Sequence, residues 1–193
     1  MKIGITGGIG AGKSVVSDML RQMGYMVYDS DSEAKHLMST DPDIINRLTL
    51  RYGSDIYIDG KINRTKLASI IFNNNAEIAF VNSIVHPAVC RDYSLKASDL
   101  DISFIESAII FEAHLDQYID AVIFVEAPIK TRIDRVILRD NTSRAKIIER
   151  INNQNTSRPN HLCITHYTIN NDGIQPLKPQ LDNILTQIKV KSE

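Results

Sequence analysis

Residues 7–14 have the sequence GGIGAGKS, which fills every fixed position of the phosphate-binding pattern G-x4-G-K-[ST]. An apolar run at residues 1–5 precedes this loop, and apolar residues at helical spacing follow it as far as Gly24. Strand, glycine loop and helix, in that order, form the context in which the pattern binds phosphate. The sequence therefore predicts that the first 24 residues form the nucleotide-binding start of an α/β fold.

The residue types in this P-loop account for its expected chemistry. Its glycines let the backbone turn and present successive N–H groups to a polyphosphate. Lys13 is expected to reach the β- and γ-phosphates, and the Ser14 hydroxyl is placed to hold Mg²⁺. We therefore predict that the chain binds a nucleoside triphosphate. The residues expected to contact it are Gly8, Ile9, Gly10, Ala11, Gly12, Lys13, Ser14 and Val15.

Bulk composition argues against several kinds of partner. The 193 residues include 22 basic and 23 acidic side chains, and a net charge of −1 gives no general affinity for nucleic acid or an anionic membrane. No apolar run has the length of a membrane span and no leader peptide is recognisable, so we expect a cytoplasmic protein. Cys90 and Cys163 lie far apart and are expected to be reduced, buried thiols. Nothing in the sequence indicates an oligomeric state.

A pair of carboxylates follows the second expected strand, residues 25–28. Ligands of open parallel sheets bind at the carboxyl ends of the strands. Asp29 and Asp31, on a strand expected to neighbour the P-loop strand, are therefore placed for chemistry on the γ-phosphate, and an extended backbone would point them the same way. The alternative is that Ser30 and Glu33 form a capping box and that Asp31 only favours the start of the next helix. The spacing leaves both interpretations open.

Residues 33–98 are expected to be mostly helical. Asp41-Pro42 has the form of a helix start, and Asp59-Gly60 that of a turn. His86-Pro87 is expected at a helix end or in the core. This block is too long for a simple connection between parallel strands, so we interpret it as a helical insertion that closes over a substrate.

The sheet is expected to resume near residues 102–106 and to include the apolar run 121–125. A basic helix follows, and its arginines at 132, 135 and 139 share one face. They form either a solvated charged surface or a lid whose arginines meet the phosphates. A second lid helix at 145–155, a loop at 156–160, a strand at 167–169 and an amphipathic last helix complete the expected fold.

Three classes of P-loop protein are compatible with the loop alone: nucleotide switches, motor ATPases and small-molecule kinases. The guanine-binding N-K-x-D motif of GTPase switches does not occur in the chain, and Glu106 stands alone where a motor would have adjacent acids. A kinase needs a P-loop, an acceptor-binding insertion, a carboxylate and a basic lid, and each has a candidate here. We therefore favour a kinase. A nucleotide switch is the alternative, and an RNA-associated ATPase is disfavoured by the charge balance.

Taken together, the motifs resemble the dephospho-CoA kinase family over nearly the whole chain. The matching segments are Thr6 to Ser14, Asp29-x-Asp31, Asp59-Gly60-Lys61-Ile62-Asn63-Arg64 with Leu67 and Phe72, Val85-His86-Pro87, Phe111-Glu112, Arg135-x3-Arg139, Arg150-x3-Gln154 and Tyr167-x-Ile169-x-Asn171. The P-loop belongs to many families, but the combination is much more specific.

The resemblance implies a three-layer P-loop α/β fold with a five-stranded, mainly parallel sheet. Residues 1–32, 99–128 and 159–193 would form the nucleotide-binding core, 33–98 a helical acceptor domain and 129–158 a helical lid. The implied reaction transfers the γ-phosphoryl group of ATP, with Mg²⁺, to the ribose 3′-hydroxyl of dephospho-CoA, the last step of coenzyme A biosynthesis. A kinase for another small acceptor, such as a nucleoside monophosphate, is the nearest alternative.

The resemblance also implies roles for single residues. Asp31 would orient the 3′-hydroxyl and accept its proton, and Lys13 would bind the phosphates. Arg139 is the preferred lid arginine, with Arg135 second, and His86 falls in the acceptor domain.

Five positions depart from the family pattern. The chain has Glu106 and Ala108 where the family has Asp and Pro, Arg132 where it has glutamine, and Thr165-His166 where it has Ala-Asp. These departures concern the nucleotide pocket and the lid, and leave the P-loop and Asp31 unchanged.

Overall fold

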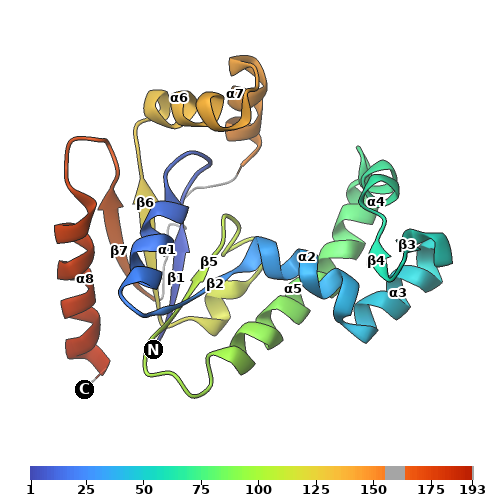
Figure 1. Ribbon diagram of the computed structural model, residues 1–193, viewed down its shortest axis with the longest axis horizontal. Helices are drawn as coiled ribbons and strands as arrows, with labels where there is room; N and C mark the ends of the chain where they lie inside the picture. Colours follow the sequence, from blue (N-terminus) through green and yellow to red (C-terminus); the bar gives the residue numbers. More distant parts are fainter. Residues whose placement is uncertain (155–163, 193) are drawn as a thin grey trace. The chain divides into compact units, whose positions relative to one another are not determined.

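The computed structural model describes residues 1–154 and 164–192. It divides into two compact units, Met1–Tyr28 with Ala97–Glu193, and Asp29–Lys96. The first unit contains most of the sheet and the second is mainly helical (Figure 1). Three sequence predictions fall outside the described residues: the loop expected at residues 156–160, residue 155 at the end of the predicted second lid helix, and the thiol of Cys163.

The main sheet has five strands. They are β1 (Lys2–Thr6), β2 (Met26–Asp29), β5 (Ser103–Glu106), β6 (Ala121–Glu126) and β7 (Thr165–Asn170), in the order β2-β5-β1-β6-β7. The pairs β1·β5, β1·β6 and β6·β7 are parallel, which confirms the predicted sheet. One expectation is wrong: β5 lies between β2 and β1, so the strand that ends at Asp29 is not the direct neighbour of the P-loop strand. A parallel connection crosses over and can skip a position, and sequence order does not reveal this.

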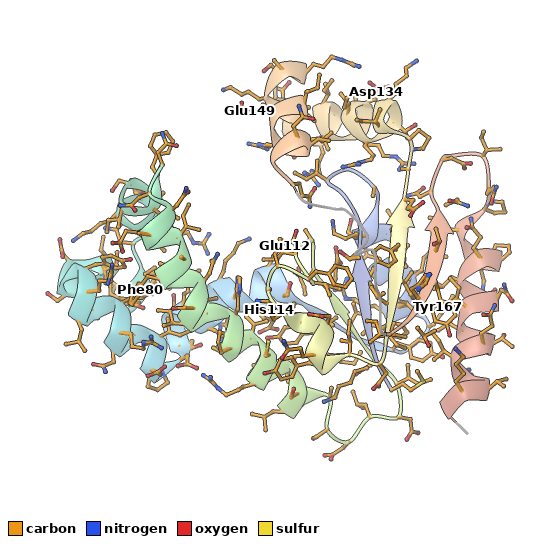
Figure 2. The ribbon with its side chains drawn as sticks, turned by 180° about the vertical axis from the view of Figure 1, so that it is seen from behind. Phe80, Glu112, His114, Asp134, Glu149 and Tyr167 are labelled. Atoms are coloured by element: carbon orange, nitrogen blue, oxygen red, sulfur yellow. The ribbon has the colours of Figure 1, made fainter. Side chains whose placement is uncertain are left out.

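Helices cover one face of this sheet. Side chains of β1, β5, β6 and β7 form one buried cluster with α1 (Lys13–Gln22) and α8 (Leu177–Ser192). Leu181, Ile184, Leu185 and Ile188 of α8 belong to it, as expected for an amphipathic last helix. Tyr167 of β7 lies in the same cluster (Figure 2).

The segment that follows β5 covers the other face. A Cβ on Gly4 would lie 2.6 Å from the Cδ1 of Ile110 and 2.7 Å from that of Ile119, so these side chains fill the space above β1. A turn and the short helix η2 (Leu115–Tyr118) lie in this segment. The layers agree with the predicted α/β class. The two helices expected to form the lid are α6 (Ile129–Asp140) and α7 (Arg144–Asn153).

The second unit consists of four α-helices and a small hairpin. Its elements are α2 (Ser30–Thr40), α3 (Pro42–Tyr52), η1 (Ser54–Ile56), β3 (Tyr57–Ile58), β4 (Lys61–Ile62), α4 (Arg64–Ile71) and α5 (Asn75–Lys96). Asp41 caps α3, whose first residue is Pro42, and Asp59-Gly60 forms the turn of the β3·β4 hairpin with φ of 49° and 72°. Both predictions are confirmed.

His86-Pro87 lies inside α5, not at a helix end. Proline costs the helix one backbone hydrogen bond. Buried residues before and after it, including Ile84 and Ala88, keep α5 packed within the unit, and this packing outweighs the local preference. Cys90 of α5 is a free, buried thiol, and burial raises its pKa.

Helices α3 and α5 are joined by an ion-pair cluster. Arg51 donates from Nε and Nη2 to the two carboxylate oxygens of Glu77, at 2.8 and 2.7 Å, and the Tyr52 hydroxyl donates to Oε2 at 2.5 Å. The Arg51 guanidinium also lies 4.2 Å from the centre of the Phe80 ring, which Figure 2 labels. The two donors hold the pKa of Glu77 at about 2, and burial together with Glu77 raises that of Tyr52 to about 12.

Candidate nucleotide-binding site

The P-loop joins β1 to α1, and its backbone conformation requires glycine at two positions. Gly10 and Gly12 have φ of 76° and 98°, in the region that L side chains rarely adopt. A Cβ on Gly10 would lie 2.4 Å from the carbonyl oxygen of Arg132, and one on Gly12 would lie 2.1 Å from Nδ2 of Asn171. Other parts of the same unit therefore approach the loop too closely for any side chain.

Groups at the start of α1 are arranged to receive an anion. Lys13 donates from Nζ to the carbonyl of Gly7 at 2.9 Å, so its amine lies at the beginning of the loop. The first N–H groups of a helix have no partner within it and carry a partial positive charge. The Ser14 side chain is exposed, and its hydroxyl has no hydrogen bond to any residue that the structure describes. Val15 is largely exposed.

The Ser14 oxygen fits the requirements of Mg²⁺. In kinase sites this ion takes one or two protein oxygens and completes its shell with water and substrate phosphates. Residues 1–154 and 164–192 contain no group of three or more His, Cys, Asp or Glu side chains able to hold a metal. Glu106 is half-buried at the carboxyl end of β5, in register with Ile5 of β1. Ser14 is thus the residue of the loop whose oxygen could hold this ion.

Arg132 of α6 lies directly against the P-loop. Its Nε donates to the carbonyl of Ile9 at 2.9 Å, and its guanidinium occupies the space where a Cβ of Gly8 would be, 2.1 Å from Nη2. Nη2 is buried and has no hydrogen-bond partner among the described residues. Burial lowers the pKa of Arg132. The sequence placed Arg132 on the basic face that it shares with Arg135 and Arg139, and marked it as a departure from the family pattern.

Asn171 and Arg135 hold the next part of the loop. The buried Asn171 donates from Nδ2 to the carbonyl of Ala11 at 2.8 Å, and its backbone N–H donates to the carbonyl of Glu126 at 2.7 Å. Arg135 donates from Nη2 to Oδ1 of Asn171 at 3.1 Å and makes a long contact, 3.5 Å, from Nη1 to the carbonyl of Ala11. Asn171 therefore connects the end of β6 with the P-loop.

Gln154 completes this set of contacts. Its Oε1 accepts the backbone N–H of Ile9 at 2.8 Å. Gln154 and Asn171 belong to segments of the sequence that match the family pattern, but the pattern predicts no role for either side chain. Their fixed spacing from Arg150 and Tyr167 was the available signal, but it does not identify the atom that each side chain contacts.

Arg139 has different partners from the other lid arginines. It donates from Nε and Nη2 to the carboxylate of its neighbour Asp140, at 2.6 and 3.1 Å, and its side chain is 65% exposed. This pairing lowers the pKa of Asp140. Arg139 follows Arg132 by seven residues, or about 10 Å along the helix axis. Its contact with phosphate stays a prediction.

The acidic pair is arranged differently from the expectation. Asp29 caps α2: its carboxylate accepts the backbone N–H of Asp31 at 3.1 Å and that of Ser32 at 3.2 Å. The predicted cap, Ser30, is already the first helical residue, so the backbone is not extended between positions 29 and 31. Asp31 lies in the first turn of α2. Its carboxylate is exposed and has no partner among the described residues.

Asp31 and the P-loop belong to different units of the structure. Within the first unit, the fold brings together Lys13, Arg132 and Arg135 around the P-loop. Backbone N–H groups, a lysine and arginines around a glycine loop are the groups that bind a polyphosphate. No helix of the described residues has the length and apolar character needed to cross a membrane.

Comparison with known proteins extends this picture. A family model described as dephospho-CoA kinase matches residues 1–176. A curated dephospho-CoA kinase of Bacteroides fragilis is 46% identical over 116 residues, which cover 58% of this chain and 57% of that protein. For a relative from Porphyromonas gingivalis, the matched residues cover 56% of that protein. The chain thus spans a little over half the length of these curated relatives.

Solved structures match over a longer part of the chain. One from Thermus thermophilus is 27% identical, has a TM-score of 0.77 and covers 99% of this chain and 97% of its own. A dephospho-CoA kinase from Campylobacter jejuni is 19% identical and shares the fold, with a TM-score of 0.70 and coverage of 100% on both sides. The family model covers nearly all of the elements described above. This chain belongs to the dephospho-CoA kinase family.

Proposed function

We propose that the protein transfers the γ-phosphoryl group of ATP to the ribose 3′-hydroxyl of dephospho-CoA and releases CoA and ADP. The observation that carries this proposal is the dephospho-CoA kinase family match over residues 1–176. The P-loop supports it, because its backbone, Lys13 and the neighbouring arginines supply the donors that phosphoryl transfer requires. A cytoplasmic location, without nucleic acid as a partner, belongs to the same proposal.

The P-loop has the task of holding the triphosphate. Residues 8–15 surround the β-phosphate with backbone N–H groups, and Lys13 leaves the Gly7 carbonyl to reach the terminal phosphates. The Ser14 hydroxyl holds Mg²⁺, which when bound neutralises charge on the phosphates. Arg139, with Arg135 as second choice, meets the transferring group when the lid of residues 129–158 closes and excludes water.

Asp31 has the task of positioning the acceptor. Its exposed carboxylate is able to accept a hydrogen bond from the 3′-hydroxyl and then the proton. Because the transition state of phosphoryl transfer is loose, orientation of the hydroxyl matters more than the strength of the base. Residues 33–98 bind the acceptor, and residues 1–32, 99–128 and 159–193 form the nucleotide-binding core.

The test is ADP release with ATP and Mg²⁺ across dephospho-CoA, AMP, CMP, adenosine and no acceptor. Asp31→Asn is compared with Asp43→Asn, which removes another acid from the first turn of a helix in the same unit. We expect turnover on dephospho-CoA alone, with CoA as product. Asp31→Asn should lose about 10²-fold or more in kcat and still bind ATP, whereas Asp43→Asn should match the wild type.

Other outcomes contradict the proposal in distinct ways. Turnover on AMP or CMP without turnover on dephospho-CoA would assign a different acceptor. ATP binding without acceptor-dependent ADP release would indicate a nucleotide switch. Equal activity of Asp31→Asn and Asp43→Asn would show that Asp31 has no catalytic role, but it would not contradict the proposed reaction.

A further inference from the structure

The Nη2 group of Arg132 is a buried cationic donor without an acceptor. Nε of the same guanidinium is satisfied by the Ile9 carbonyl, but Nη2 has no partner among the described residues. A buried donor without a partner is unfavourable, and buried arginines normally meet a carboxylate. No carboxylate of residues 1–154 or 164–192 lies within ion-pair distance of Arg132.

The position of this donor indicates what its acceptor is. The guanidinium lies over Gly8, and the two carbonyls that hold Arg132 and Lys13 belong to Ile9 and Gly7, which flank Gly8. Two cations therefore meet at the first residues of the P-loop. Because the lysine of the P-loop motif contacts the terminal phosphates, we expect an oxygen of those phosphates to lie close to Arg132 as well.

In the two neighbouring lid arginines, Arg135 and Arg139, the Nη2 group already has a hydrogen-bond partner. Nη2 of Arg135 donates to Asn171, and Nη2 of Arg139 donates to Asp140. Of the three arginines, Arg132 lies against Gly8, and its buried Nη2 has no partner within the described part of the chain.

We propose that Arg132 donates from Nη2 to the γ-phosphate of the bound nucleotide and so favours triphosphate over diphosphate. This inference rests on the proposed function, because it requires ATP in the P-loop. Nε keeps its bond to the Ile9 carbonyl, which fixes the guanidinium plane, and Nη2 supplies a charge-assisted hydrogen bond. Arg132 thereby adds a second cation to Lys13 at the transferring group.

The test compares nucleotide affinities of the full chain by calorimetry with Mg²⁺, using ADP and a non-hydrolysable ATP analogue. Arg132→Gln removes the charge and retains an amide donor for the Ile9 carbonyl. Arg144→Gln is the control, because Arg144 is an exposed arginine of α7 that pairs at 3.6 Å with Asp134 of α6, the residue labelled in Figure 2. We expect Arg132→Gln to weaken binding of the ATP analogue about tenfold and to weaken binding of ADP less than about twofold. Arg144→Gln should change neither by more than about twofold.

A second variant guards against a folding defect in Arg132→Gln. Gly8→Ala keeps the arginine but places a methyl group in the volume of its guanidinium. Gly8→Ala should also weaken binding of the ATP analogue more than binding of ADP. The double variant should bind the analogue no more weakly than Arg132→Gln alone, because both substitutions remove the same interaction.

The possible results separate this inference from the proposed function. Equal losses for ADP and the analogue would mean that Arg132 only shapes the loop, and unchanged affinities would mean that it has no role in binding. Either result overturns the inference and leaves the kinase proposal intact. A wild-type protein that binds neither nucleotide would overturn the proposed function itself.

Discussion

Arg132 and Arg51 show how the same side chain is used in two opposite ways. In the second unit, Arg51 donates to both oxygens of Glu77 and lies over the Phe80 ring, so its charge is paired within the protein. In the first unit, Arg132 is held through Nε alone and keeps a buried donor without a partner. An arginine whose charge is paired with a carboxylate indicates a structural contact. An incompletely paired one beside a glycine loop indicates a ligand.

The largest expected effect tests the P-loop side of this comparison. Lys13→Met removes the amine that the loop holds at the Gly7 carbonyl. We expect kcat to fall by about 10³-fold, because the charge on the transferring group loses its nearest cation. The measurement is ADP release with dephospho-CoA, and unchanged thermal unfolding would show that the fold is intact. A loss below tenfold would mean that Lys13 is not in contact with the terminal phosphates.

A smaller effect is expected from the residue that braces the P-loop. Asn171→Ala removes the bonds to the Ala11 carbonyl and to Arg135. Because the remaining carbonyl is buried, we expect a loss of about 1–3 kcal/mol in the free energy of unfolding and about tenfold weaker ATP binding. Asn170→Ala is the matched control, since Asn170 is exposed and precedes it directly. Equal behaviour of the two variants would contradict the bracing role.

The ion-pair cluster gives a pH-dependent prediction. The pKa of Glu77 is lowered to about 2 from 4.5, so the folded state favours the ionised form. The resulting stability is fully present above pH 4.5 and is lost as the pH falls towards 2. Glu77→Gln should therefore be less stable than the wild type at pH 7, and the difference should shrink below pH 4.5.

Urea unfolding from pH 7 to pH 3 measures this convergence. Asp43→Asn is the control, because Asp43 belongs to an exposed pair with Arg47 at 3.9 Å and should change stability little at any pH. A difference between wild type and Glu77→Gln that is independent of pH would show that the ionised carboxylate is not what stabilises the contact between α3 and α5.

The smallest expected effect concerns the third member of the cluster. Tyr52→Phe removes the hydroxyl that donates to Glu77 and leaves the bidentate contact with Arg51. The pKa of Glu77 should rise from about 2 but stay below 4.5, because Arg51 is its largest influence. Carboxyl NMR titration would measure it. A pKa that does not move would assign no role to the hydroxyl.

Local sequence patterns predicted most of the fold and only part of the site. The P-loop, the Asp41 cap, the hairpin turn and the last helix each depend on neighbouring residues, and the structure confirms them. The strand order depends on a crossover, which leaves no local pattern, so the place of β2 was wrong. The cap of α2 was misassigned by one position because both Asp29 and Ser30 are good capping residues.

The contacts to the P-loop were not predictable for a different reason. Arg132, Gln154 and Asn171 reach the loop from 123, 145 and 160 residues away. Periodicity places a residue on a face of its own helix, but not against an atom of a distant loop. A basic face on α6 was visible in the sequence. Which arginine contacts the loop became clear only from the structure.

The bond between Asn171 and Ala11 has a consequence for synthesis of the protein. The donor is made 160 residues after the acceptor, and β7, which carries it to the sheet, pairs with β6 only when both have left the ribosome. Domains fold largely as units while the chain grows from its N-terminus. The loop at the beginning of the chain thus lacks this brace until the chain has grown past Asn171, and it acquires its braced form only after β7 has joined the sheet.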